Sequence, residues 1–400
     1  MQRHHDNHIT YLGRTNARNS NRLFGIRSHD RLSSMYIIGK TGTGKTTLLE
    51  NIALQDIKNG NGLTLIDYHG DLVERIVTHI PEHRCGDVDY FNVTKDTPYG
   101  YNPLKPVPAQ YRALAASGLL EIFRMHWGER AWGQRMEHIL RQAILALLEQ
   151  PREMTLPDIL RLLREEEFRK DVAAKVGHTA VQDFWLHEYP KYSSSYRADA
   201  ISPVQSKISA FLANPKLYTI LTKPQKPLSF RKIMDGGRIL LVNLSVGQLG
   251  ADSAGLLGGL LTTSIGLAAL SRADIPEEER RPHALIADEF QHMTSKSLIN
   301  LFPQLRKYKL SMIVAHQYIH QISEDIRHAI LGNVGTIISF RVGAHDARVL
   351  AKEFEPTFTA QDLTKLPNYS IYLKLMIDGA PSKPYSADTL LSLNRKYLLS

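Results

Sequence analysis

Short apolar runs alternate with amphipathic segments in the first part of the chain. Met35 opens the run MYII, which predicts a buried strand, and residues 45–59 repeat apolar positions at helical spacing. The runs at 63–67 and 87–93 predict two more strands, with a helix over residues 71–80 between them. Because crossover connections join strands that alternate with helices, this pattern predicts a mainly parallel sheet covered by helices on both faces.

Residues 104–234 carry a different pattern. Apolar positions recur at helical spacing in MEHILRQAILALLEQ and LPDILRLLREEEF. Four strand-like runs follow this region, RILLVNL, ALIADEF, LSMIVAHQ and TIISFRV, and SIYLKLMIDGAPSKPYSA predicts a hairpin. We therefore expect an α/β core built from residues 34–103 and 235–400, interrupted by an all-α insertion domain over residues 104–234. Residues 1–33 hold six arginines and two acids, and are expected to form a basic arm or short strands.

One segment is long and apolar enough to be tested as a membrane span. Residues 253–271, SAGLLGGLLTTSIGLAALS, contain no charge, and Gly255 and Gly259 have the spacing of a small-residue packing motif. Further glycines and hydroxyl groups dilute its hydrophobicity, and it directly follows the strand-like run GRILLVNLS. We interpret it as a core helix, with membrane contact as the alternative.

The composition is that of an ordinary globular chain, with 43% apolar and 22% charged residues in 400. The single cysteine, Cys85, cannot form an internal disulfide, so a reducing compartment is expected. The chain opens with the polar run MQRHHDNH, which does not resemble a signal peptide. These features predict a cytoplasmic protein without a membrane anchor of its own.

Basic residues exceed acidic ones by 49 to 40, and they are unevenly spread. The chain between Asp199 and Asp235 contains no acid, and such a block favours a polyanion partner, although a solvated face would have the same composition. Just before the block, three tyrosines in YPKYSSSYR either stack on single-stranded bases or are half-buried packing residues. The basic residues of the block are Lys207, Lys216, Lys223, Lys226, Arg231 and Lys232, and the tyrosines are Tyr189, Tyr192 and Tyr196.

The segment GKTGTGKT, residues 39–46, is a complete phosphate-loop pattern between a strand and a helix. Glycines at this spacing expose backbone N–H groups to phosphate oxygens, and the following helix aims its positive end at them. Lys45 is expected to reach the terminal phosphates of ATP, and the Thr46 hydroxyl to complete the shell of Mg²⁺. The expected nucleotide-binding residues are Gly39, Thr41, Gly42, Thr43, Gly44, Lys45, Thr46 and Thr47.

Two acids follow the apolar run of ALIADEF, where a buried strand would end. We expect Asp288 to hold the magnesium ion and Glu289 to act as the general base, so the site should hydrolyse ATP. An ordinary turn is the alternative. Asp67 also follows a strand, and could assist the metal or form a turn. The histidines at the N-terminus lack companion ligands at useful spacing, so no zinc site is expected.

The stretch LRKYKLSMIVAHQ places Arg306 before a strand and Gln317 after it. Ligands lie beyond the carboxyl ends of parallel strands, so Gln317 is expected to sense the nucleotide of its own subunit. Six strand residues at about 3.3 Å each separate the two ends by roughly 20 Å. Arg306 should therefore act on a neighbouring subunit as an arginine finger, which requires an oligomer, or else form a basic surface cluster. Rival fingers are Arg327, Arg341 and Arg348.

The order of the motifs GKTGTGKTT, LIDYHGD, YNPL, IADEF, LRKYKLSMIVAHQ and NVGTIISFRVG resembles the HerA/FtsK superfamily of DNA-pumping ATPases. It is especially similar to the cytoplasmic part of type IV secretion coupling proteins of the TraG/TraD kind, from Phe24 to Phe354. The resemblance implies a RecA-like P-loop NTPase core with an all-α insertion domain, Arg306 as the finger and Gln317 as the sensor. It also implies a hexameric ring with DNA in its central pore.

Three features depart from this pattern. Membrane helices of the coupling proteins and the barrel domain of HerA proteins are not expected here, and His316 stands where a small hydroxyl residue is commoner. The sequence favours an ATP-driven DNA translocase that acts as a ring on single- or double-stranded DNA, in DNA transfer, a mobile element or phage defence. A nuclease, a relaxase or a secretion channel could be its partner. The alternatives are a secretion or protein-remodelling ATPase, and a nucleotide-gated module that recruits a nuclease or relaxase.

Overall fold

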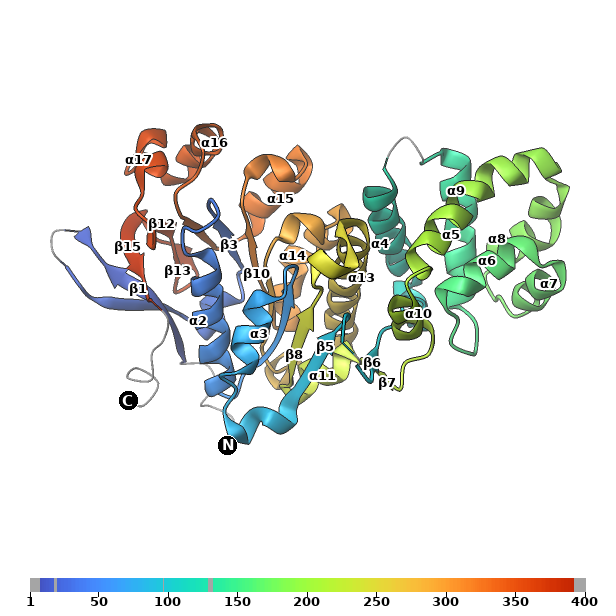
Figure 1. Ribbon diagram of the computed structural model, residues 1–400, viewed down its shortest axis with the longest axis horizontal. Helices are drawn as coiled ribbons and strands as arrows, with labels where there is room; N and C mark the ends of the chain where they lie inside the picture. Colours follow the sequence, from blue (N-terminus) through green and yellow to red (C-terminus); the bar gives the residue numbers. More distant parts are fainter. Residues whose placement is uncertain (1–7, 18–19, 96, 129–131, 392–400) are drawn as a thin grey trace.

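The computed structural model describes residues 8–17, 20–95, 97–128 and 132–391. A large sheet with helices on both faces forms one end of the molecule, and a group of helices extends from one side of it (Figure 1). This arrangement confirms the predicted α/β core with additional helices. The division of the chain into domains stays a prediction.

In the part of the chain that the structure describes, the main sheet has eleven strands, and all neighbours from β11 to β5 are parallel. The four strands at the other edge pair antiparallel. In spatial order the strands are β2 (Leu23–Arg27), β1 (Ile9–Thr15), β15 (Tyr385–Thr389), β12 (Ser370–Lys374), β11 (Thr336–Ser339), β3 (Met35–Ile38), β10 (Leu310–His316), β9 (His283–Ala287), β4 (Gly62–Asp67), β8 (Ile239–Asn243) and β5 (Val88–Asn92). Two short ladders join β6 (Tyr99–Gly100) to β7 (Lys226–Pro227) and β13 (Met376–Ile377) to β14 (Ala380–Pro381).

The helices fall into two groups. Those around the sheet are α1 (Ser28–Arg31), α2 (Lys45–Lys58), α3 (Asp71–Val77), α11 (Phe230–Gly236), α12 (Val246–Leu249), α13 (Ala251–Leu270), α14 (Lys296–Leu305), α15 (Glu324–Asn333), α16 (Ala344–Phe354) and α17 (Ala360–Lys365). Those of the predicted insertion are α4 (Ala109–Trp127), α5 (Gln134–Leu148), α6 (Leu156–Arg164), α7 (Glu166–Ala174), α8 (Thr179–Asp183), α9 (Ser194–Leu212) and α10 (Pro215–Thr222).

The central strands are buried throughout and mostly apolar because both faces of the sheet are covered. In β3, Met35 and Ile37 join the core formed with α2 and α3. The intervening Tyr36 and Ile38 join the core formed with α13 and α14 on the opposite face. The period of two therefore divides one apolar run between two separate cores.

The N-terminal segment supplies the short strands that the sequence allowed. Strand β1 pairs antiparallel with both β2 and β15, so the described part of this segment extends the main sheet. Residues 370–387 turn back as predicted, with β12 paired to β15 and β13 to β14. Both ends of the described chain thus complete the same edge.

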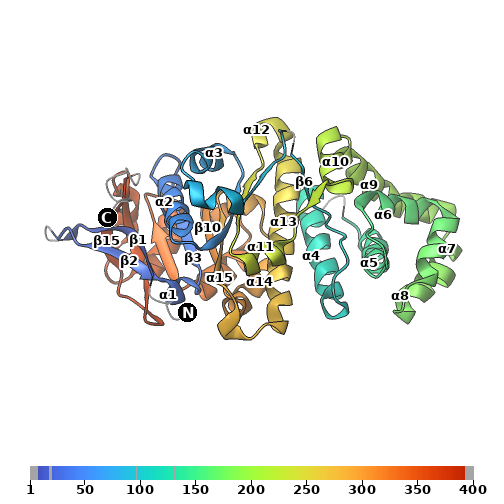
Figure 2. The ribbon, with the colours of Figure 1, turned by 90° about the horizontal axis from the view of Figure 1, so that it is seen from below.

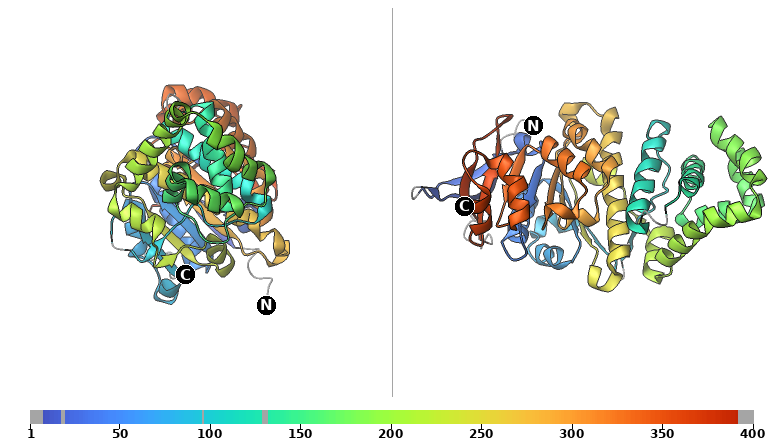
Figure 3. Two further views of the ribbon diagram at one scale, coloured as in Figure 1. Left: turned by 90° about the vertical axis from the view of Figure 1, so that its right-hand side faces the viewer. Right: turned by 90° about the horizontal axis from the view of Figure 1, so that it is seen from above.

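The apolar segment tested as a membrane span is helix α13. It is long and apolar enough to cross a membrane, but 78% of its most apolar window is buried inside the fold. Helix α4 packs beside it (Figures 2 and 3). A Cβ added at Gly255 would lie 2.3 Å from His126 Cε1, and one at Gly259 would lie 2.6 Å from Ile122 Cδ1. The small residues serve close packing of two helices within the protein, as the core interpretation predicts.

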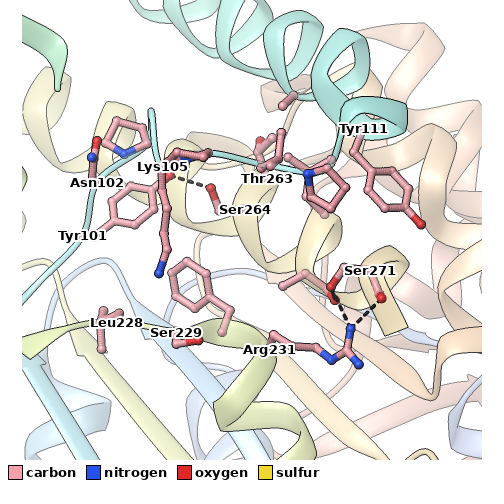
Figure 4. A pocket seen from close by; sticks show the side chains of 18 of the residues that line it. Tyr101, Asn102, Lys105, Tyr111, Leu228, Ser229, Arg231, Thr263, Ser264 and Ser271 are labelled. Carbon is pink, nitrogen blue, oxygen red and sulfur yellow. Dashed lines mark hydrogen bonds between the residues drawn. The ribbon is translucent and has the colours of Figure 1, made fainter. Parts of the chain in front are cut away.

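A cavity lies where the predicted insertion joins the core, with an internal volume of about 200 Å³. Figure 4 shows Tyr101, Lys105 and Tyr111 from one connection and Arg231 from the other around this space, with Ser264 of α13 at its wall. The Tyr101 hydroxyl hydrogen-bonds Ser264 Oγ at 2.6 Å, and the Tyr111 hydroxyl donates to the carbonyl of Leu270. The first connection and the start of α4 are therefore tied to α13.

Candidate nucleotide site

The loop between β3 and α2 has the backbone conformation that its glycines permit. Gly42 and Gly44 have φ angles of 75° and 119°, which residues with a Cβ rarely adopt. The Lys45 side chain is buried, and its Nζ donates hydrogen bonds of 2.6 and 3.2 Å to the carbonyl oxygens of Gly39 and Lys40. The ammonium group therefore lies inside the curve of the loop.

Asp288 and Glu289 lie at the carboxyl end of β9, and both are buried. The Thr46 hydroxyl donates to Asp288 Oδ2 across 3.5 Å, so the two predicted metal ligands face each other. Glu289 has a φ of 53°, a left-handed conformation that is uncommon outside glycine and that clusters at functional sites. The structure thus brings the loop and the acidic pair together.

Burial and neighbouring charges shift the pKa values of both Asp288 and Lys45. Burial raises the pKa of Asp288 to about 6, with further contributions from Glu289 and Asp67, while Lys45 acts in the opposite direction. Burial lowers the pKa of Lys45, and Asp288 and Glu289 oppose that shift. Because both groups are kept from water, the Lys45 ammonium favours a bound anion, and the Asp288 carboxylate favours a bound cation.

Gln317 connects the loop to the acidic pair. Its Oε1 accepts a 2.9 Å hydrogen bond from the Thr41 hydroxyl, and its Nε2 donates to Glu289 Oε1. The connection is possible because β10, which ends one residue before Gln317, lies between β3 and β9 in the sheet. Gln291, which the sequence did not single out, donates a 2.6 Å hydrogen bond to Glu289 Oε2. Both carboxylate oxygens of Glu289 are therefore held by amides.

His316, which had no assigned role, is a buried link between two strands. Its Nε2 hydrogen-bonds the Tyr36 hydroxyl on β3, and burial lowers the pKa of His316 to about 3. The imidazole is thus neutral at physiological pH. Its position at the end of β10 fixes the base of the phosphate loop without adding a charge there.

Asp67 has a structural role in this geometry. Its Oδ2 accepts hydrogen bonds of 2.7 and 3.1 Å from the backbone N–H groups of Leu72 and Val73, and its Oδ1 accepts one from His69. The first two donors belong to the first turn of α3, where backbone N–H groups lack partners within the helix. The turn interpretation of Asp67 therefore accounts for its contacts.

Arg306 does not join the cluster. It lies in a short 3-10 helix, Arg306–Tyr308, before β10, whereas Gln317 follows the other end of that strand. Its side chain is exposed and forms no ion pair with the residues that the structure describes. Of the rivals, Arg341 is held by the Leu366 carbonyl and Asn368, and Arg327 by Glu324. Arg348 is exposed on α16.

The basic block and the three tyrosines make contacts within the chain. Arg231 pairs with Asp235 and Asp274, and Lys216 donates to the carbonyl of Thr94. Tyr189 is fully buried and donates to the Leu163 carbonyl, which excludes it from stacking on a base. Arg231 and Lys216 thus make structural contacts, but Lys223, Lys226 and Lys232 are exposed, so a polyanion partner for this block stays a prediction. The stacking hypothesis is wrong for Tyr189.

The residues around the loop fit a nucleotide phosphate and a magnesium ion. Lys45 is a buried cation that forms no ion pair with any described carboxylate, so an anion would complete its surroundings. Thr46 and Thr47 stand in the first turn of α2, whose N-terminus favours negative charge. Thr46 and Asp288 offer oxygen atoms, the donors that Mg²⁺ prefers.

The fold and the loop define a P-loop NTPase. Within that class, the chain belongs to the family described as the type IV secretion-system coupling protein DNA-binding domain, whose sequence model matches residues 26–370. This membership confirms the resemblance that the motifs indicated. None of the curated proteins that were compared matches the chain.

Solved structures share the fold at low sequence identity. The plasmid coupling protein TrwB in complex with ADP and Mg²⁺ is 16% identical, with a TM-score of 0.66 over 96% of this chain and 92% of that one. TrwB with the GTP analogue GDPNP is also 16% identical, with a TM-score of 0.66 over 92% of this chain and 88% of that one. VirB4 of Thermoanaerobacter pseudethanolicus is 15% identical, with a TM-score of 0.63 over 99% of this chain and 98% of that one.

The raised pKa of Asp288 predicts that magnesium assists nucleotide binding less at low pH. Below about pH 6 the carboxyl takes up a proton and loses the charge that attracts the metal; above it the charge is restored. Calorimetric titration with ADP, with and without Mg²⁺, should therefore show a larger magnesium effect at about pH 7.5 than at about pH 5.5.

The Asp288→Asn variant is the control, because the nucleotide phosphates also titrate in this range. The variant should show a small magnesium effect at both pH values. Equal pH dependence in the two proteins would contradict the role given to Asp288.

Proposed function

We propose that this protein is an ATP-driven DNA translocase that works as a ring-shaped oligomer of six copies in the cytoplasm. The observation that carries the hydrolytic part is the position of Glu289, which lies beside the phosphate loop with both oxygens held by amides. The family to which the chain belongs is described as a DNA-binding domain, which supports DNA as the partner.

Each residue of the cluster has a distinct proposed role in hydrolysis. Lys45 neutralises charge on the terminal phosphates, and Glu289 accepts a proton from the attacking water. A magnesium ion held by Thr46 and Asp288 would neutralise further phosphate charge. Gln317 reports the terminal phosphate, because it contacts both the loop through Thr41 and the base through Glu289.

The position of Arg306 supports action between subunits. Arg306 is exposed and precedes β10, whereas the nucleotide residues follow the carboxyl ends of the strands. The two therefore lie at opposite ends of the strands. A finger in this position reaches a phosphate only on a neighbouring copy, so the complete site requires an oligomer.

Replacing Glu289 with glutamine tests the hydrolytic role. Glu289→Gln keeps the size of the side chain but removes the base and one of the two acceptor oxygens, so hydrolysis should fall by about 100-fold or more. Binding of ADP, measured by calorimetry, should be retained. The matched control is Glu279→Gln, which changes an exposed glutamate in the 3-10 helix Glu277–Glu279 and should leave the rate unchanged. A Glu289→Gln protein with the original rate would contradict the assignment.

Mixing two inactive variants tests the finger. Arg306→Ala lacks the proposed finger and Lys45→Ala lacks its own phosphate contact, so each alone should hydrolyse ATP poorly. In a mixture, an intact Arg306 of one copy can face an intact Lys45 of the next, and part of the activity should return. The exposed Arg152 supplies the control variant Arg152→Ala, which should be fully active alone.

Normal activity of Arg306→Ala alone would show that Arg306 is not the finger. If Arg348→Ala, prepared in parallel, were the inactive variant instead, the finger would be reassigned to α16. Failure of the mixture to recover, with both variants folded and oligomeric, would contradict action between subunits.

A further inference from the structure

Two histidines and an aspartate converge beside the nucleotide site, and none of them has a role in the proposed hydrolysis. His320 belongs to a 3-10 helix, Ile319–Gln321, that begins two residues after Gln317. His345 and Asp346 stand in the first turn of α16. The ligand atoms of all three residues lie within 4.8 Å of one another. The sequence did not indicate this group, because its members lie on different elements.

The potential ligand atoms of the three side chains lie close together. His320 Nε2 and His345 Nδ1 share a hydrogen bond of 2.5 Å, with the ring centroids 3.9 Å apart and the ring planes nearly perpendicular. His320 Nε2 also lies 3.8 Å from Asp346 Oδ1. A tetrahedral zinc ion with bonds of about 2.0–2.2 Å needs neighbouring ligand atoms about 3.3 Å apart. The two measured separations bracket that value, so small rotations of the exposed imidazoles would meet it.

The surroundings suit a metal with an open position. The carboxylate of Asp346 is almost fully buried and accepts the backbone N–H of Ile319, so it is fixed in place. The imidazoles of His320 and His345 are exposed, which leaves the fourth position to water. Two imidazole nitrogens with one carboxylate oxygen favour zinc and similar transition metals over magnesium or calcium.

A second group of potential ligands lacks this freedom. His29, Asp30 and Asp378 also lie close together. The two oxygens of Asp30 already accept the backbone N–H groups of Asp378 and Gly379, and Asp378 pairs with Arg27. The carboxylates of this second group are therefore engaged in joining β2 to the C-terminal hairpin. We do not propose a metal site there.

We propose that His320, His345 and Asp346 form a binding site for a transition-metal dication such as Zn²⁺. The ion would join the segment after Gln317 to the start of α16, two elements that the His320–His345 hydrogen bond and the Asp346 carboxylate also connect. Asp346 also lies near enough to Lys40 of the phosphate loop to interact with its charge. Metal binding would thus restrain the segment that directly follows Gln317 and contains His320.

Zinc binding to the full chain tests the proposal directly. The chelator-treated protein would be titrated with Zn²⁺ by calorimetry, without nucleotide and with excess Mg²⁺ to occupy the carboxylates of the nucleotide site. We expect one equivalent to bind, and His320→Ala and His345→Ala each to weaken binding at least about tenfold. Zinc should also slow amide hydrogen exchange in residues 319–321.

Two controls separate this site from other histidines. His328→Ala removes an exposed histidine on the nearby helix α15 and should bind zinc like the original protein. Combined replacement of His4, His5 and His8 by alanine removes the other histidine-rich segment and should leave the equivalent in place.

Circular dichroism of each variant would establish that it is folded. Unchanged binding by folded His320→Ala and His345→Ala, or loss of the equivalent with the N-terminal histidines, would overturn the proposal. Absence of zinc binding by the original protein would do so too. None of these outcomes depends on ATP hydrolysis, so failure here leaves the proposed function untouched.

Discussion

The site depends on opposite charges that are kept out of water at the carboxyl ends of the central strands. Lys45 of the phosphate loop and the two acids after β9 are all buried, and burial moves the pKa of Lys45 down and that of Asp288 up. Such desolvation is costly in an empty fold and is relieved when ligands of complementary charge bind. The cost of burying charged groups is thus concentrated where phosphate and metal would bind.

The strand order of the sheet makes this concentration possible. Strand β10 lies between β3 and β9, so the residue that follows it stands between the phosphate loop and the acidic pair. Gln317 occupies that place and hydrogen-bonds to both sides. Behind it, the neutral His316 hydrogen-bonds Tyr36 and ties β10 to β3. A shift of β10 would therefore disturb the loop and Glu289 together.

Much of this architecture could be predicted from the sequence because local patterns determine it. The central strands are mostly apolar runs, and the glycine spacing of the loop marks a backbone that few other residues adopt. Apolar composition did not separate a buried helix from a membrane span in α13. The fold does so, because Gly255 and Gly259 of α13 meet α4.

Other features depend on contacts between residues far apart in the chain, so they could not be predicted from the sequence. Asp67 and Asp288 both follow strands, yet the backbone N–H groups of α3 bind the first and Thr46 faces the second. Tyr189 was grouped with two other tyrosines as a possible stacking residue, but it packs in the core. His320 and His345 are separated along the chain, and only the fold brings their nitrogens together.

The most direct test of the central claim is the steady-state rate of ATP hydrolysis with and without DNA as salt is raised. A translocase should hydrolyse ATP faster on single strands or duplex, and the stimulation should fall steeply with salt because phosphate contacts dominate binding. A rate that no DNA alters at low salt would contradict the account. It would point instead to a polypeptide substrate or to a nucleotide-gated module.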